Sequence, residues 1–445
     1  MNVFFVSLGC DKNLVDSEKM LGLLREAGYT FTDDEYEAEV IIVNTCCFIG
    51  DAKEESIQTL IDMGKHKEDG RCLVLIAAGC LAQRYREEIR TELPEVDGIL
   101  GTASYDAIAD VVRSALEEGK SERFLDVNRP VCVRENRLVT TGGHYAFLKI
   151  AEGCDKRCSY CVIPKVRGCY RSVPLEELER EARFLADAGV RELILVAQET
   201  TLYGMDLYGE KKLPELLKRL AAIDGIRWIR LQYCYPEEIT EELIETIRTE
   251  KKVCHYLDMP VQHINDRILK RMGRKTGKKE LMAQIERLRR AVPDMVLRTT
   301  LLTGFPGETE EEFEELCGFV KEARFERLGV FAYSREEDTP AAMMPDQIPE
   351  EIKQERRNIL MELQQEVSLE RSREKIGQVL EAFVEGNVAD ENVCVARTYM
   401  DAPNVDGYFF LHTERELMTG QFVRARVTGA MDYDLIGELE DEFTE

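Results

Sequence analysis

The chain lacks the segments that mark a membrane protein or a secreted protein. Its longest hydrophobic run, residues 72–82, is about 11 residues long, which suits a buried strand and is too short to cross a bilayer. The first residues, MNVFFVSLGC, have no basic segment ahead of their apolar residues, so we expect no signal peptide. These absences predict a cytoplasmic protein without a membrane anchor.

Basic residues are also scarce. The sequence holds 59 Lys and Arg against 85 Asp and Glu, which gives a formal net charge of −26. A protein that binds a phosphate backbone usually carries a basic footprint, so the composition argues against nucleic-acid binding as the main role. An acidic surface attracts basic partners. The alternative, that the charge serves solubility alone, stays open.

Cysteine, by contrast, is abundant. The 445 residues are enough for two or three domains with full cores, and they include 14 Cys. Because the cytoplasm keeps thiols reduced, so many cysteines favour metal or redox chemistry over disulfides.

Three of these cysteines share one loop, AEGCDKRCSYCVIPKVRG, at residues 151–168. Cys154, Cys158 and Cys161 are separated by three and then two residues, and they follow an alternating run at residues 145–150 that predicts a strand. Four-iron, four-sulfur cubanes are bound by Cys sulfur and normally take four protein ligands. Three thiolates would therefore leave one iron open to another ligand.

Two alternatives compete with the iron-sulfur interpretation of this loop. The thiols could form a disulfide with one to spare, or they could belong to a zinc knuckle. Zinc sites usually close their fourth position with a nearby His or Cys, and no His lies between His144 and His255. The iron-sulfur interpretation is therefore favoured.

The CxxxCxxC loop after a strand resembles the signature of the radical S-adenosylmethionine enzymes. In that family, the amino and carboxylate groups of the cofactor chelate the open iron. The resemblance implies a partial β/α barrel and a reductively generated 5′-deoxyadenosyl radical.

Residues 1–118 alternate between strands and helices, which is the pattern of a parallel sheet with crossover helices. Cys10, Cys46 and Cys80 each fall just past a predicted strand. Because the carboxyl ends of parallel strands form a common crevice, these three thiols can converge on a second cluster site. The alternative is that they are small buried residues at tight turns.

The segments SLGCDKNLVDSE, NTCCFIGDAKEES and GCLAQRY resemble the three cysteine motifs of the methylthiotransferase N-terminal domain. The resemblance implies that Cys10, Cys46 and Cys80 bind an auxiliary iron-sulfur cluster there. Cys47 stands beside Cys46 and could compete with it. The sequence assigns no role to Cys169, and Cys132 is expected to be structural.

Residues 119–139 are polar and rich in turn signals, so they are predicted to be a linker. Residues 140–370 resume the strand and helix alternation, and the resemblance makes them the radical core. Active sites of β/α barrels lie at the carboxyl ends of the strands. The predicted cofactor-binding residues on that rim are Gln198, Gly304, Gly307 and Glu308.

Other polar residues near the rim receive less specific predictions. His263 is expected to be a hydrogen-bonded barrel residue, and Lys149 and Arg167, which flank the cysteine loop, are expected to be solvated. The sequence shows no candidate catalytic triad.

The end of the chain changes character. Residues 350–375 predict one amphipathic helix that packs on the barrel, and residues 373–441 contain five short alternating runs that predict a small antiparallel β-barrel. This part resembles the OB-like TRAM domain. Residues 370–445 hold 17 acidic and seven basic side chains, which favours a basic protein partner over RNA.

Together the three resemblances identify an α/β protein as a member of the radical S-adenosylmethionine methylthiotransferases, and of their RimO type. They imply two 4Fe-4S clusters and S-adenosylmethionine as cofactors, and a basic small-subunit ribosomal protein, modified at an aspartate, as substrate. They also imply a reductant protein such as flavodoxin or ferredoxin, and a sulfur donor. The alternatives are a tRNA adenosine methylthiotransferase and, more remotely, a non-catalytic iron-sulfur protein that docks on ribosomes.

Overall fold

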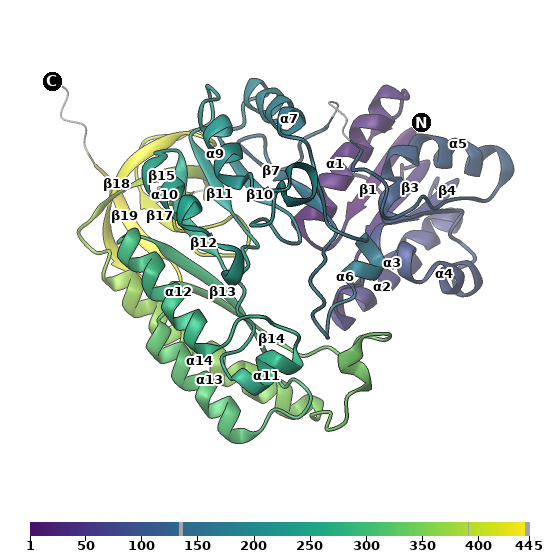
Figure 1. Ribbon diagram of the computed structural model, residues 1–445. Helices are drawn as coiled ribbons and strands as arrows, with labels where there is room; N and C mark the ends of the chain where they lie inside the picture. Colours follow the sequence, from purple (N-terminus) through teal and green to yellow (C-terminus); the bar gives the residue numbers. More distant parts are fainter. Residues whose placement is uncertain (133–136, 390, 441–445) are drawn as a thin grey trace.

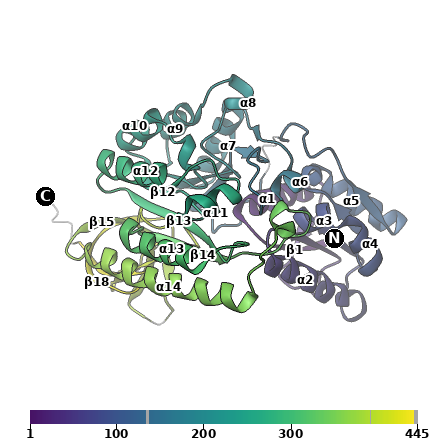
Figure 2. The same cartoon turned by 60° about the horizontal axis from the view of Figure 1, so that its bottom comes forward.

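The computed structural model describes residues 1–132, 137–389 and 391–440. They form two six-stranded sheets, a closed five-stranded barrel and a two-stranded sheet. Figure 1 shows the first sheet and the terminal barrel on opposite sides of the central sheet, and Figure 2 shows the same order from a second direction. The predicted fold class is confirmed, and the predicted domain limits stay predictions.

The first sheet has the strand order β2-β1-β3-β4-β5-β6, and all its neighbours pair in parallel. Its inner strands are buried apolar runs, as expected for a sheet covered by helices on both faces. The strands are β1 (Asn2–Ser7), β2 (Thr30–Phe31), β3 (Val40–Thr45), β4 (Val74–Ala78), β5 (Gly98–Leu100) and β6 (Ser121–Arg123). The helices are α1 (Asp11–Glu26), α2 (Gly50–Asp69), α3 (Gly79–Arg84), α4 (Arg86–Glu92), η1 (Thr102–Ala107) and α5 (Ile108–Glu118).

Part of the predicted linker belongs to this sheet. Residues 121–123 pair in parallel with β5 and form its edge strand, because their backbone groups complete the hydrogen bonds that β5 would otherwise leave open. Residues 133–136 of the predicted linker and residues 390 and 441 of the predicted terminal domain lie outside the described residues.

The central sheet has the order β14-β13-β12-β11-β10-β7, again with parallel neighbours throughout. It is an open barrel whose helices cover the outer face. The strands are β7 (Tyr145–Lys149), β10 (Glu192–Val196), β11 (Trp228–Leu231), β12 (Val253–Asp258), β13 (Val296–Thr303) and β14 (Arg327–Ala332). The helices are α6 (Ile163–Arg167), α7 (Leu175–Asp187), α8 (Met205–Tyr208), α9 (Leu213–Ala221), η2 (Pro236–Glu238), α10 (Glu241–Thr249), α11 (Asp266–Arg271), α12 (Lys278–Ala291), α13 (Glu310–Ala323), η3 (Pro340–Met343) and α14 (Glu350–Arg373).

The terminal barrel closes in the order β15-β16-β17-β19-β18. Its pairs are antiparallel except for β17 and β19, which run in parallel. The predicted small antiparallel β-barrel is present, and it includes one parallel pair because strand directions cannot alternate all the way around a closed ring with an odd number of strands. The strands are β15 (Val379–Asn387), β16 (Val393–Arg397), β17 (Phe409–His412), β18 (Phe422–Ala430) and β19 (Leu435–Leu439).

Buried ion pairs attach this barrel to the inner side of the central sheet. Arg397 of β16 bonds Glu192 of β10 at 2.7 Å, and both side chains are fully buried. Aromatic rings pack around the pair, among them Trp228 and Phe383. The terminal barrel therefore packs against the inner face of the central sheet.

The first sheet covers the opposite end, where the central strands finish. Lys12 of α1 lies 3.3 Å above the ring of Tyr233, which directly follows the β11 region. Arg84 of α3 bonds Glu336 at 2.9 Å, beyond the end of β14. The carboxyl ends of both parallel sheets thus face each other. Among the described residues, no helix is both long and apolar enough to cross a membrane.

Candidate functional site

Cys10, Cys46 and Cys80 lie at the carboxyl ends of three neighbouring strands. Cys10 precedes α1, Cys46 follows β3, and Cys80 is the second residue of α3, which follows β4. These positions bring together residues that are 70 apart in the chain. The convergence expected from strand order is therefore present.

Asn13 ties the three segments together. Its Nδ2 donates to the carbonyl oxygens of Leu8 and Thr45, at 2.9 Å each. Its Oδ1 accepts from the Cys80 thiol at 3.8 Å. One amide side chain thus touches the segment ahead of each of the first two cysteines and the third thiol itself. Sequence reasoning did not single out Asn13, although it lies within the SLGCDKN motif.

Gly9 fixes how closely Cys10 and Cys46 approach. Its φ is +87°, and a Cβ at this position would lie 2.7 Å from Cys46 Cβ and 2.9 Å from Cys46 Sγ. Cys46 is held from the other side by Ser56, whose hydroxyl accepts from the Cys46 amide at 2.9 Å. Cys47 packs into the hydrophobic core beneath the sheet. The close contact with Gly9 therefore belongs to Cys46.

The second triplet is held in a loop with contacts on both sides. The amide of Cys154 donates to Gly168 at 3.1 Å, and the amide of Cys161 donates to Cys158 at 3.1 Å. The short strands β8 (Ala151–Glu152) and β9 (Arg171–Ser172) pair across the base of the loop. The loop is thus tied to its own return segment.

The thiols are buried in both triplets, apart from Cys10, which is exposed, and Cys161, which is half-buried. Burial, with a smaller contribution from the neighbouring Cys158, raises the pKa of the Cys154 thiol to about 12. Burial also raises the pKa of Cys46 and of Cys80. At neutral pH these thiols hold their protons, so binding of a metal cluster would release protons from them.

The donor sets suit a cluster better than a single ion. Among residues 1–132, 137–389 and 391–440, no group of three or more His, Cys, Asp or Glu is placed to hold one metal ion. In a cubane each thiolate binds a different iron, so the sulfurs stand further apart than the ligands of one ion. Each set supplies three cysteine thiols, which is the ligand type that such clusters take.

A buried network of charges links Cys80 to Glu152, which lies two residues before Cys154. Arg167, at the end of α6, places Nη2 3.5 Å from Cys80 Sγ and Nη1 3.0 Å from Glu152. Lys149 bonds the same Glu152 carboxylate at 2.7 Å, and Arg167 bonds Asp16 of α1 at 2.6 Å. The expectation that Lys149 and Arg167 are solvated is wrong, because both are buried where the first sheet meets the barrel rim.

Gln198 continues this network toward the second triplet. Its Nε2 donates to Glu152 at 2.9 Å, while its Oε1 is buried without a partner. Two further acceptor atoms are buried without hydrogen-bond partners: Glu199 Oε2, which like Gln198 follows β10, and Gln232 Oε1, which follows β11. Three acceptor atoms without donors suit a ligand that presents N–H or O–H groups.

Glu199 has an unusual acidity for a carboxyl group. Burial raises its pKa to about 7, and its Oε2 lies 4.0 Å from the nearest cation, Lys156. The Glu199 carboxyl therefore changes charge near neutral pH.

Gly304, Gly307 and Glu308 form the turn after β13, as predicted, with φ of +71° and +75° at the two glycines. The Glu308 carboxylate bonds Arg356 of α14 at 2.7 Å and accepts from the Gly304 amide at 3.0 Å. The buried His263 lies 3.5 Å from it, and His263 Nδ1 accepts from the Asn265 amide. Glu308 therefore holds the turn, and its role toward a cofactor stays a prediction.

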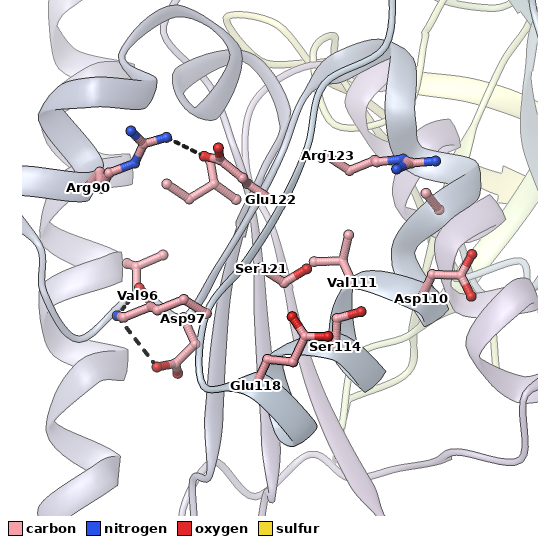
Figure 3. Close-up of a pocket in the computed structure, with 13 residues that line it drawn as sticks. Arg90, Val96, Asp97, Asp110, Val111, Ser114, Glu118, Ser121, Glu122 and Arg123 are labelled. Atoms are coloured by element: carbon pink, nitrogen blue, oxygen red, sulfur yellow. Dashed lines mark hydrogen bonds and ion pairs between the residues drawn. The ribbon is translucent and has the colours of Figure 1, made fainter.

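Two cavities lie away from the thiols. One, of about 500 Å³, is lined by Gly307 and Glu308 together with residues of α11 and α14. The other, of about 680 Å³, lies between α5 and the edge of the first sheet, where Glu122 pairs with Arg90 at 2.6 Å (Figure 3). No predicted site residue lines this second cavity.

Known families match the chain in three parts. The Radical SAM superfamily matches residues 148–320, the uncharacterized protein family UPF0004 matches residues 2–101, and the TRAM domain matches residues 376–439. A ribosomal protein uS12 methylthiotransferase RimO from Lachnoclostridium phytofermentans is 59% identical over 99% of this chain and 100% of its own length. The chain belongs to the RimO family. A further RimO, from Geobacter sulfurreducens, is 50% identical over 98% of each chain.

Solved structures agree with this fold at low sequence identity. The radical S-adenosylmethionine methyltransferase TsrM from Kitasatospora setae, solved with cobalamin and a [4Fe-4S] cluster bound, has a TM-score of 0.54 and 15% identity over 94% of this chain and 83% of its own. This likeness concerns the fold alone. As a RimO, the protein is a radical S-adenosylmethionine methylthiotransferase, a transferase of a sulfur-containing group. The preference for this type over the tRNA-modifying relative is confirmed.

Proposed function

We propose that this protein adds a methylthio group to the β-carbon of an aspartate in ribosomal protein uS12, the substrate named for its RimO relatives. Cys154, Cys158 and Cys161 hold one 4Fe-4S cluster, and Cys10, Cys46 and Cys80 hold the other. The observation that carries this proposal is the contact of Arg167, six residues after Cys161, with Cys80 of the other thiol set.

The two clusters and S-adenosylmethionine, when bound, supply a carbon-centred radical and a methylated sulfur, chemistry that no protein side chain provides. The chain's own residues bind, orient and exclude water. Gln198 presents a buried acceptor next to the cysteine loop. The positive φ of Gly304 and Gly307 shapes the turn after β13 that we assign to the cofactor. Glu308 keeps that turn in place. Because the first sheet covers the barrel rim, the reaction takes place away from bulk water.

The acidic character of the chain supports a basic protein as partner. The net charge of −26 favours approach of a basic ribosomal protein through long-range attraction. We place the enzyme in the cytoplasm, where ribosomal proteins are made. A flavodoxin or ferredoxin is proposed as the reductant, and a separate sulfur donor replaces the sulfur that is transferred.

The decisive experiment uses the anaerobically reconstituted protein with uS12 and, separately, with tRNA. We expect a methylthio mass increment on uS12 and none on tRNA. An increment on tRNA alone would reverse the choice of substrate.

The Cys154→Ala variant tests the assignment of the clusters. It should form no 5′-deoxyadenosine while it keeps the iron of the N-terminal cluster. The matched variant Cys80→Ala should lose the iron of the N-terminal cluster and still cleave the cofactor. Reductive formation of 5′-deoxyadenosine by the unmodified protein also excludes the non-catalytic alternative. Unchanged cleavage in Cys154→Ala contradicts the assignment.

A further inference from the structure

One short segment breaks the acidic character of the chain. Residues 267–279 contain seven Lys and Arg and no Asp or Glu, within a protein of net charge −26. The segment covers α11, the turn after it and the start of α12. We define its unpaired, outward part together with Arg157 as the basic surface: Arg157, Lys270, Arg271 and Lys275.

The cations of the basic surface have no acidic partners among the described residues. Arg267 and Lys278, which flank them, are paired with Glu312 and Glu315. Arg157, Lys270 and Lys275 are exposed and make no ion pair, and Arg271 contacts only the Met344 sulfur through its guanidinium. Unpaired cations at the surface keep their charge available to a partner.

The surface lies directly over the cysteine loop. Ser159 donates from its amide to Met272 at 2.9 Å and accepts from Ala341 at 2.8 Å, so the loop is clamped by the α11 turn and by η3. A Cβ at Gly273 would lie 2.8 Å from the Arg157 carbonyl oxygen and 3.6 Å from the Cys158 Cα. The exposed backbone at Gly273 thus touches the residue that carries a buried cluster thiol.

An apolar side chain sits beside these cations. Met343 of η3 is 82% exposed, and its neighbour Met344 accepts from Arg271 at 3.9 Å. A small patch of cations with one exposed apolar side chain is suited to a brief encounter with an oppositely charged protein, because charge speeds association and a small contact area permits release.

We propose that the basic surface is the docking site for an acidic one-electron carrier protein, which reduces the cluster held by Cys154, Cys158 and Cys161. The carrier loses one electron to that cluster, and no bond forms or breaks. An electron carrier is favoured over an RNA contact because the backbone at Gly273 packs against Arg157 and Cys158, which brings the surface close to a thiol that binds the cluster to be reduced. This inference rests on the proposed function.

The test compares two double charge reversals. K270E/K275E alters the basic surface, whereas K251E/K321E alters two exposed, unpaired lysines that precede β12 and end α13, at the opposite end of the central strands. Each reconstituted protein is titrated with an acidic bacterial flavodoxin, by binding of the oxidised form and by cofactor cleavage with the reduced form. Dithionite, which needs no docking site, drives a parallel cleavage assay.

K270E/K275E should weaken flavodoxin binding and raise its half-saturating concentration about tenfold at low salt, with a smaller rise for K270Q/K275Q. The difference should disappear at about 0.5 M salt, and dithionite-driven cleavage should stay within about twofold of the unmodified protein. K251E/K321E should match the unmodified protein in every assay.

Equal flavodoxin affinity in K270E/K275E and K251E/K321E overturns the proposal. The proposal also fails if K270E/K275E loses affinity for a ribosomal RNA fragment but keeps its affinity for flavodoxin. That result would assign the surface to RNA. If the unmodified protein cleaves no cofactor even with dithionite, the proposed function fails, and the binding titration still decides the docking site.

Discussion

The Nη2 atom of Arg167 lies 3.5 Å from the Sγ atom of Cys80. Cys80 belongs to the domain of the first sheet. Arg167 is the last residue of the short helix α6, which follows the three cysteines of the central domain. When Cys80 binds a cluster as a thiolate, the guanidinium gives it a charge-assisted hydrogen bond that stabilises negative charge on sulfur. The contact links the first cysteine triplet to the segment that follows the second triplet.

Loss of this contact should make the N-terminal cluster harder to reduce, because reduction adds negative charge next to Arg167. In a protein whose Cys154, Cys158 and Cys161 are replaced by Ala, R167Q should lower the midpoint potential by about 60 mV, equivalent to a hydrogen bond of roughly 1.5 kcal/mol. R167K, which keeps the charge, should lie between R167Q and the parent. The potential is measured by redox titration of the cluster's electron paramagnetic resonance signal, and identical potentials in the three proteins would refute the coupling.

A methyl group at Gly9 should abolish the N-terminal cluster. Gly9 and Gly28 both have positive φ, so Ala at either position costs about 1 kcal/mol of backbone strain. Only at Gly9 would the new Cβ collide with Cys46, whereas nothing lies within 4 Å of it at Gly28. Iron per chain should fall from about eight to about four in G9A and stay near eight in G28A, since each cluster holds four irons. Retention of eight irons in G9A would remove Cys46 from the ligand set.

The turn after β13 should depend on Glu308 for stability even without cofactor. Arg356 contacts both Glu308, which is fully buried, and Glu310, whose side chain is 67% exposed. E308Q leaves a buried guanidinium poorly paired and should lower the free energy of unfolding by about 3 kcal/mol, whereas E310Q should change it by less than about 0.5 kcal/mol. Urea unfolding of the cofactor-free proteins measures both. If E308Q is as stable as E310Q and only binds S-adenosylmethionine more weakly, Glu308 acts on the cofactor alone.

Acid should detach the terminal barrel. Burial by itself raises the pKa of Glu192, but Arg397 and Arg230 more than offset it, so the pKa lies below its ordinary value of 4.5. For an acid with a lowered folded pKa, the stabilisation is complete above 4.5 and is lost as the pH falls through the lower folded pKa. Trp228, the single tryptophan, packs against Phe383 and Phe422 of the barrel and reports the contact by fluorescence.

The fluorescence change on acidification should be reversible and should precede loss of helical circular dichroism. E192Q removes the titrating group, so its Trp228 signal should already differ from the unmodified protein at neutral pH and should vary less between neutral and acid pH. A signal that follows global unfolding in both proteins would place the acid sensitivity elsewhere.

The sequence alone predicted the strands and the placement of the cysteines at the ends of strands, because both depend on local pattern. Cys10, Cys46 and Cys80 follow buried strands of a parallel sheet, and strand order then brings them together. The five strands of the terminal barrel could be read from alternation in the same way. The ligand assignments themselves stay predictions.

The charged network escaped sequence analysis for a physical reason. Arg167 meets Asp16, which lies 151 positions earlier, only because two sheets pack with their carboxyl ends together. A lone cation beside a loop is usually solvated, and nothing local marks this one as buried. The one signal in the sequence for a buried Arg167 was its position soon after the three cysteines and directly before Gly168.

The buried arginines on the inner wall of the central sheet have consequences for biosynthesis. Arg230 donates to Tyr399 at 2.6 Å, and Arg327 bonds Asp401, so the acceptors are translated up to 169 positions after the donors. Until the nascent chain has released those later residues from the exit tunnel, Arg230 has Glu192 as a partner but lacks the Tyr399 acceptor, and Arg327 lacks Asp401. The inner face of the central sheet therefore becomes rigid only after the last residues have been translated. The thiols at the carboxyl ends of the strands belong to a protein whose packing is completed last.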